Sequence, residues 1–402
     1  MGITGSTVLP DATSDASPNV ADFSCLHLTR RQAAASLADP LGGPVRGQSA
    51  TASPITFETE KAIMRFRTSG GRTRRAMVGV GVAMSTAFTG PAHAGTQHTP
   101  NVTEFPVTPS SGPTFITAGP GCTVWFTELT GNRIGRIRND GKVTEFPIPT
   151  PDGAPLDVTA GPDGAMWFTE FLGNKIGRIT GTGDITEFPI PAPDSRPEGI
   201  ATGPDGNLWF TEGAGGKIGR ITASGEVTEF PMLTSGSSPH AITAGPDGAM
   251  WFTDPGGNRI GRITLTGRIT EFTLPAPKSS PHRIVTGPDG NLWFTERAVD
   301  RIGRITPGGR ITEFQLTEGR LPLDIAPGTG GDLWFTERAA NCIGRITPTG
   351  KIAEFAVPTP GSDPLGITAA GGTTVWFAEG ASDKIGRLRA PHHARHGHTG
   401  CP

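Results

Sequence analysis

The chain carries almost no net charge, no tyrosine and few cysteines, and these shortages narrow its possible functions. Its 402 residues include 35 Lys and Arg against 37 Asp and Glu, a formal net charge of −2. It therefore lacks the basic surface that nucleic acids or anionic membranes attract. The apolar run at residues 76–88 is too short to cross a bilayer. Of the four cysteines, Cys25 precedes this run and three follow it, and an odd number cannot pair completely.

Residues 64–94 have the pattern of an export signal. Met64 begins a basic segment, the apolar run follows, and Pro-Ala-His-Ala ends at Ala94. This order is typical of a signal peptide, so we predict cleavage after Ala94, a secreted or extracytoplasmic protein, and no membrane association after cleavage. An Arg-Arg pair at Arg75 leaves a twin-arginine signal open. Residues 1–63 show no repeat, and we interpret them as an unstructured or cytoplasmic extension or as a mis-assigned start, with translation beginning at Met64.

Tryptophan occurs only inside one repeated stretch, which organises the rest of the chain. Residues 237–272 show one unit: SSPHAITAGPDGAMWFTDPGGNRIGRITLTGRITEF. A Trp-Phe pair recurs every 42 residues, once 41, beginning at Trp125, Trp167, Trp209, Trp251, Trp293, Trp334 and Trp376. A fixed period of this length indicates a repeat architecture.

Each unit predicts four short strands. In the unit above we expect them at 241–244, 249–254, 259–264 and 268–274, with Gly-Pro-Asp-Gly supplying the first tight turn. Trp and Phe on opposite faces of the second strand suit a sheet that is covered on both sides. Four strands in about 42 residues match the blade of a β-propeller.

The ends of the repeat predict how the ring closes. Seven Glu-Phe strands occur, but the first precedes every Trp-Phe strand, and the last unit has no fourth strand. We predict that residues 102–107 complete the last blade, so that 101–389 form an all-β, seven-bladed β-propeller closed by its N-terminal strand. Residues 390–402 contain four histidines, which we interpret as a solvated His-rich tail.

One position varies while the repeat around it is constant. It follows the proline that starts each inner strand and holds Thr114, Leu156, Glu198, His240, His282, Leu323 and Leu365. Differences among repeats mark function. Glu198, His240 and His282 fall on successive blades, and two imidazoles with a carboxylate can transfer protons near neutral pH, so we predict a catalytic group in the axial pocket. A water-filled polar lining is the alternative.

A second set of polar residues recurs in every blade. These are the acids that follow Trp-Phe-Thr or Trp-Phe-Ala. Because all seven blades have one, we expect a structural role, either pairing with Arg or Lys of the third strand or capping a turn.

The repeats resemble those of the virginiamycin B lyase (streptogramin B lyase) family. The resemblance rests on Gly-Ile-Thr-x-Gly-Pro-Asp-Gly, Trp-Phe-Thr-Glu and Lys-Ile-Gly-Arg-Ile-Thr across residues 101–389. It implies an elimination that opens the ester of cyclic depsipeptide antibiotics, with Mg²⁺ and a histidine base on the last two blades. Those base positions are Leu323 and Leu365 here, whereas Asp363 and Glu379 lie at or near the acid positions of the family, which makes them the candidate metal ligands.

Three functions remain open on the sequence. The first is a lyase, with a site rotated to His240, His282 and Glu198 or a substrate that spans the channel. The second is a secreted ligand-binding propeller without chemistry, and the third is a metal-dependent lactone or ester hydrolase. Fold alone does not choose among them. We expect a small-molecule ligand in the axial pocket of a monomer.

Overall fold

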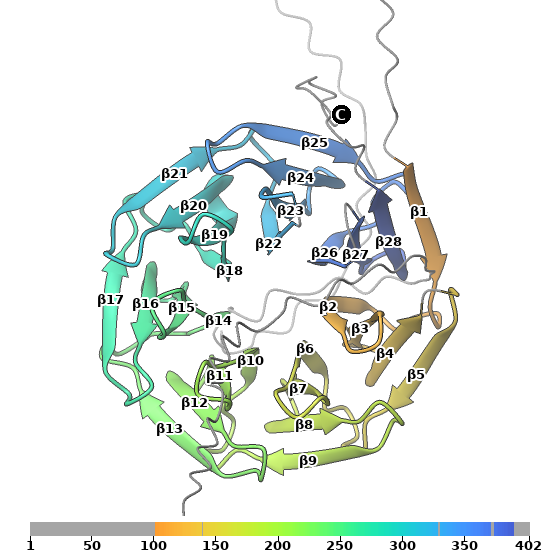
Figure 1. Cartoon of the computed structure of the whole chain (residues 1–402), viewed down its shortest axis with the longest axis horizontal. Coiled ribbons are helices and arrows are strands. Elements are labelled where there is room, and N and C mark those ends of the chain that lie inside the picture. The colour runs from red at the N-terminus through yellow and green to blue at the C-terminus, as the bar shows by residue number, and fades with distance from the viewer. Residues whose placement is uncertain (1–100, 139, 329, 371–373, 390–402) are drawn as a thin grey trace, which may run out of the picture. The chain divides into compact units, whose positions relative to one another are not determined.

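Seven four-stranded antiparallel sheets stand radially around one axis (Figure 1). The computed structural model describes residues 101–138, 140–328, 330–370 and 374–389. The extension, the signal peptide and the His-rich tail expected at 1–63, 64–94 and 390–402 lie outside these residues. Within the described ranges, no helix has the length and apolarity needed to cross a membrane. The seven-bladed all-β architecture is confirmed.

Each blade runs from an inner strand at the axis to an outer strand at the perimeter (Figure 1). Blades one and two comprise β2 (Pro113–Gly119), β3 (Thr123–Glu128), β4 (Arg133–Arg138), β5 (Val143–Pro147) and β6 (Pro155–Ala160), β7 (Met166–Glu170), β8 (Lys175–Ile179), β9 (Ile185–Pro189). Blades three and four comprise β10 (Pro197–Thr202), β11 (Leu208–Glu212), β12 (Lys217–Ile221), β13 (Val227–Pro231) and β14 (Ile242–Ala244), β15 (Met250–Asp254), β16 (Arg259–Ile263), β17 (Ile269–Thr273).

The remaining blades follow the same order. Blade five comprises β18 (Pro281–Thr286), β19 (Leu292–Glu296), the short 3₁₀ helix η1 (Arg297–Val299), β20 (Arg301–Ile305) and β21 (Ile311–Gln315). Blade six comprises β22 (Pro322–Pro327), β23 (Leu333–Glu337), β24 (Cys342–Ile346) and β25 (Ile352–Ala356). Blade seven comprises β26 (Pro364–Ala369), β27 (Thr374–Glu379), β28 (Lys384–Arg389) and, from the other end of the chain, β1 (Asn101–Pro106).

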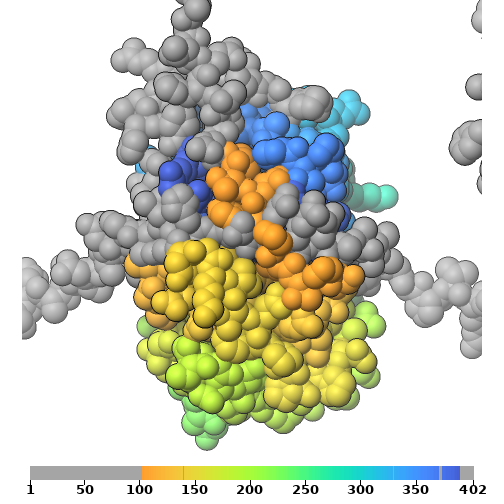
Figure 2. Space-filling view, turned by 90° about the vertical axis from the view of Figure 1, so that its right-hand side faces the viewer, coloured from red at the N-terminus to blue at the C-terminus, as the bar shows by residue number. Residues whose placement is uncertain are grey.

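Strand β1 closes the ring, as the count of Glu-Phe strands predicts. It pairs antiparallel with β28, placing Val102 opposite Leu388 and Phe105 opposite Ile385. Figure 2 looks onto this side of the ring, where the orange start of the propeller lies against the blue C-terminal blade. The closure pairs the outer edge of β28, which would otherwise expose unsatisfied backbone groups.

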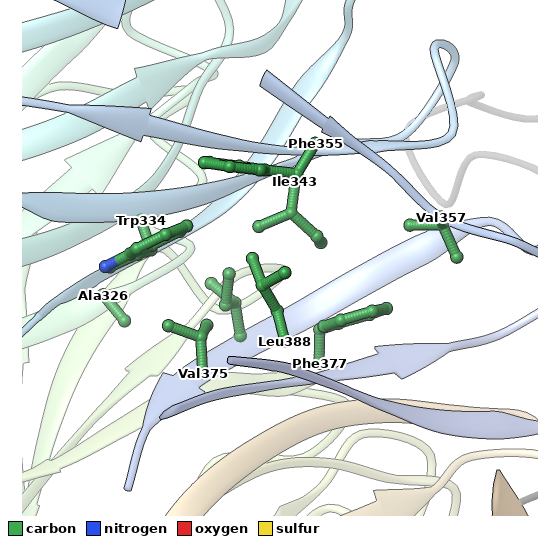
Figure 3. Close-up of a cluster of buried hydrophobic side chains, with 9 residues drawn as sticks. Ala326, Trp334, Ile343, Phe355, Val357, Val375, Phe377 and Leu388 are labelled. Carbon is green, nitrogen blue, oxygen red and sulfur yellow. The ribbon is translucent and has the colours of Figure 1, made fainter. Parts of the chain in front are cut away.

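The core lies between neighbouring blades. In the cluster of Figure 3, Trp334 of blade six packs with Phe377 of blade seven, around Ile343 and Leu388. The Trp and Phe of one strand therefore face opposite neighbours, as expected. The glycine of Ile-Gly-Arg makes room for the phenylalanine, since a Cβ on Gly177 would lie 2.0 Å from the ring of Phe168.

The threonine of Trp-Phe-Thr links each blade to the next. Its hydroxyl donates a hydrogen bond of 2.6–2.9 Å to the carbonyl of the variable inner-strand residue of the following blade. In blade two, for example, Thr169 donates to the carbonyl of Glu198. Blade seven has Ala378 at this position. The repeat therefore holds the variable position by its main chain, which leaves its side chain free to differ.

Candidate active site

Glu198, His240 and His282 come together beside the axis, on three successive blades. Glu198 is the second residue of β10, His282 is the second residue of β18, and His240 lies just before the short strand β14. Nε2 of His240 lies 3.1 Å from Oε2 of Glu198, and the two imidazole centroids are 3.9 Å apart. The three side chains form a contiguous group.

Hydrogen bonds to main-chain carbonyls assign the proton positions on both imidazoles. Nδ1 of His240 lies 3.1 Å from the carbonyl oxygen of His282, and Nδ1 of His282 lies 3.1 Å from that of Leu323. A carbonyl only accepts, so both Nδ1 atoms carry the proton, and in a neutral ring Nε2 is then an acceptor. The described residues provide no hydrogen bond to Nε2 of His282, so its lone pair is available as a base.

Burial makes the Glu198–His240 contact a neutral hydrogen bond rather than an ion pair. It raises the pKa of Glu198 to about 8. Burial, and next the charge of Arg283, lowers the pKa of His240 to about 3. The pKa of His282 is lowered well below its ordinary value by burial, then by His240, Arg297 and Arg283. Near neutral pH, the protonated carboxyl of Glu198 therefore donates to Nε2 of His240.

A second layer of side chains, which the sequence analysis did not identify, lies directly beneath this group. It is formed by the residues that follow the variable position: Phe115, Asp157, Gly199, Ala241, Arg283, Asp324 and Gly366. These residues also differ from blade to blade, and this variation was the sequence signal that could have identified the layer. In six blades the inner strand shifts register at this point.

Asp363 and Glu379, the predicted metal ligands, have other partners in this structure. The carboxylate of Asp363 forms an ion pair with the guanidinium of Arg338. Glu379 is fully buried, accepts a 2.8 Å hydrogen bond from Ser382, and has a pKa raised to about 7 by burial and then by Glu104. No cluster of three or more His, Cys, Asp or Glu suited to a metal occurs among the described residues. Asp363 and Glu379 are thus each bound by other protein groups in this structure, and their role as metal ligands stays a prediction.

The repeated acids are buried, and their expected pairing with the third-strand cation occurs in blade one, where Arg133 lies 3.9 Å from Glu128, but not in blade two. In blade two the third-strand Lys175 lies 2.6 Å from Glu187 of the outer strand and not beside the second-strand acid. That acid, Glu170, is fully buried, and burial followed by the charge of Glu187 raises its pKa to about 7. In blade four a turn is capped as expected, where Asp254 accepts from the backbone N–H of Gly257. Glu170 and Glu187 are both near Lys175, and the lysine pairs with Glu187, the outer and better hydrated carboxylate.

Comparisons with known proteins agree with this architecture. A model of the virginiamycin B lyase family matches residues 86–291 and 245–395. A search of the curated proteins found no match. Among solved structures, the selenomethionine-substituted virginiamycin B lyase from Staphylococcus aureus is 46% identical, with a TM-score of 0.71, covering 73% of this chain and 100% of that one.

Two further structures extend the comparison. A catalytically inactive histidine-to-alanine variant of the S. aureus virginiamycin B lyase, solved with quinupristin, is 45% identical over 73% of this chain and 100% of that one, with a TM-score of 0.70. A streptogramin B lyase structure is 42% identical over 72% of this chain and 97% of that one, with a TM-score of 0.70. With the family model, these matches show that the chain belongs to the virginiamycin B lyase family.

Proposed function

We propose that this protein is a secreted lyase that opens the ester of a cyclic depsipeptide of the streptogramin B type by elimination, using His282 as the base. The observation that carries the proposal is the close pair of imidazoles, with ring centroids 3.9 Å apart and both Nδ1 atoms on main-chain carbonyls, which leaves Nε2 of His282 without a hydrogen bond among the described residues. The relative solved with quinupristin supports a small-molecule ligand of this class. Membership of the family supports the type of reaction.

The elimination needs one base and a leaving carboxylate. In our proposal Nε2 of His282 removes the proton from the carbon next to a carbonyl, the electron pair of that C–H bond forms a C=C bond, and the ester oxygen departs with the C–O electrons. The proton ends on His282, and the product carries a new carboxylate and a double bond. A positioned base of this kind accounts for roughly 10² to 10⁴ in rate.

His240 and Glu198 support the base in this proposal. Nδ1 of His240 donates to the carbonyl of His282, and the carboxyl of Glu198 holds the ring of His240 through Nε2. The imidazole of His240 also lies against that of His282, tilted by 41° with the ring centroids 3.9 Å apart, which restricts movement of the reacting ring. Glu198 therefore orients the pair and supplies a proton donor, rather than a negative charge, near neutral pH.

The test is to incubate the full-length protein with a streptogramin B and to follow the linear product by mass spectrometry. We expect turnover, and we expect His282→Gln to reduce it by about 10² to 10⁴ with the melting temperature nearly unchanged. EDTA treatment of the same reaction tests the magnesium requirement that the family implies. If the intact protein linearises no streptogramin, with or without added Mg²⁺, the lyase proposal fails. Ligand binding without turnover would then identify a non-catalytic binding propeller, and release of an alcohol and an acid from simple lactones or esters would identify a hydrolase.

A further inference from the structure

A buried ion cluster crosses the axis directly below the two histidines. The guanidinium of Arg283 in blade five binds the carboxylate of Asp157 in blade two through two hydrogen bonds, of 2.9 and 2.8 Å. It also donates a 3.1 Å hydrogen bond to Asp324 in blade six. Blades two and five are as far apart as two blades of a seven-membered ring can be (Figure 1). The cluster therefore closes the axis at this level.

Each aspartate is itself fixed to the neighbouring blade. Asp157 accepts from the backbone N–H of Ile200 at 3.1 Å, and Asp324 accepts from that of Ile367 at 2.9 Å. Both carboxylates are thus also held by main-chain donors, independently of the arginine. The orientation of the guanidinium is therefore fixed, because a planar group that is hydrogen-bonded to carboxylates on two sides has little freedom to rotate.

The rest of the layer is shaped around this arginine. The ring of Phe115 lies flat against it, with Cζ of Arg283 3.9 Å from the ring centroid, and the other edge of Phe115 approaches His282 at 6.5 Å between centroids. The neighbouring positions are Gly199, Ala241 and Gly366, which have small side chains or none. A Cβ on Gly199 would lie 2.7 Å from the carbonyl oxygen of His240. The two glycines therefore let the inner strands approach the next blade closely, and Phe115 and Arg283 are the largest side chains of this layer.

We propose that Arg283 is a positioning residue that closes the axis beneath His240 and His282 and adds to their burial in opposing protonation of both imidazoles. The proposal rests on the proposed function, because it assigns these imidazoles a catalytic task. Arg283 is the residue after His282 in β18, so the ion cluster also fixes the backbone that carries the base. With the floor closed, ligand and product enter and leave from the rim above the histidines.

Several charges face the two rings, and the positive ones oppose protonation. His282 faces His240, Arg297 of η1 and Arg283, and its Nδ1 faces the carbonyl of Leu323. His240 faces Glu198, Arg283, Arg297 and, as the one charge that favours protonation, Asp157. Removing Arg283 should therefore promote protonation of the imidazoles, whereas removing the charge of Asp157 should not.

The test measures protonation directly by imidazole ¹⁵N NMR of the full-length, ¹⁵N-histidine-labelled protein at pH 5 and pH 7. In the wild type we expect the signals of His240 and His282 to be those of neutral rings at both pH values. Arg283→Met should give imidazolium signals at pH 5, which for His240 is a rise of about two pH units in the midpoint, from about 3 to about 5. Asp157→Asn should leave both rings neutral. A merely structural cluster would be loosened by either variant and would move both toward the ordinary histidine value.

Matched controls separate this inference from stability and from the lyase proposal. Arg262→Met removes an arginine that pairs with Asp247 on the outer part of blade four, and it should leave the NMR signals unchanged. If Arg283→Met does not fold, Arg283→Lys keeps the charge and should keep both rings neutral at pH 5. Neutral rings in a folded Arg283→Met, or imidazolium signals in Arg283→Lys, would overturn the proposal. If the wild type shows no turnover, the lyase proposal fails, but the NMR result still decides the role of Arg283.

Discussion

The ion pair that closes the ring should be the most costly of the equivalent pairs to break. In blade seven, Glu104 of β1 pairs with Lys384 of β28 and accepts from the N–H and hydroxyl of Thr359 at 2.8 and 2.7 Å. In blade two, Glu187 makes the same set of contacts with Lys175 and Thr150. The chemistry is the same, but the side chain of Lys384 is 1% exposed and that of Lys175 is 30% exposed.

This difference in exposure sets the expected free energies. Glu104→Ala leaves a buried ammonium without its carboxylate, which costs about 3–5 kcal/mol of unfolding free energy. Glu187→Ala leaves a lysine that turns toward water, so the loss is about 1–2 kcal/mol, mainly from the threonine hydrogen bonds. Burial alone would raise the pKa of Glu104, but hydrogen bonds from Lys384 and Thr359 outweigh it and hold that pKa below its ordinary value. The stability from Glu104 is therefore present above the unfolded pKa of 4.5 and is lost as pH falls through the lower folded value.

The assay is equilibrium denaturation of both variants at pH 7, followed by tryptophan fluorescence. We expect Glu104→Ala to lose about 2 kcal/mol or more beyond Glu187→Ala. The double variant Glu104→Ala with Lys384→Met should recover part of this loss, because it removes the unpaired charge. Equal losses in the two single variants would refute the reasoning, since closure would then add nothing to the repeated contact.

Four other predictions follow from the same contacts. Thr169→Val should cost about 1–3 kcal/mol in chemical denaturation, because the N–H of Asp157 and the carbonyl of Glu198 both lose the hydroxyl; an unchanged midpoint would contradict this. Burial, then the charge of Glu354, raises the pKa of Glu337 to about 8, so the stability from its protonated form is present below pH 4.5 and is lost as the pH rises to about 8. Glu337→Gln should therefore lose less unfolding free energy over that pH interval than the wild type. Equal slopes of unfolding free energy against pH would argue against this. Asp363→Ala should keep streptogramin turnover within a few-fold, and loss of turnover would move the site to blade seven. N-terminal sequencing of exported protein should begin at Gly95, and an earlier start would show that residues 64–94 are retained.

The fold could be predicted from the sequence because the repeat imposes it seven times. Strand β15 and the two strands after it lie within one residue of their expected ends, and β1 joins β28 as the unmatched Glu-Phe strand requires. The inner strand of blade four is shorter than expected and begins at Ile242. Any one unit leaves its strand boundaries ambiguous, but the turn residues and the alternation of Trp and Phe predict the same four strands in every unit.

The side-chain partners could not be predicted in the same way. Position along the strand suggested that Lys175 would pair with Glu170, because the two are opposite in the register. In the structure Lys175 instead reaches Glu187, on the strand beyond. Likewise, strict alternation would send Arg283 away from the axis, and the shift in register at the start of β18 brings it beneath His282 instead. Both differences depend on local backbone geometry, which the alternation of side chains along a strand does not predict.

The scaffold explains how a pair of histidines can stand on one or another pair of neighbouring blades. In six blades threonine donates a hydrogen bond to the carbonyl of the variable residue, so His240 and His282 are attached to the ring in the same way as Leu156, Glu198, Leu323 and Leu365. The side chain at that position is therefore not fixed by the repeat, and moving a histidine pair around the axis breaks no repeated contact. The layer below is less permissive, because a cation such as Arg283 needs two carboxylates at matching blades. The blades that carry His240 and His282 are consequently specified by few residues, and the ion cluster of Arg283 restricts their choice more than the repeated contacts do.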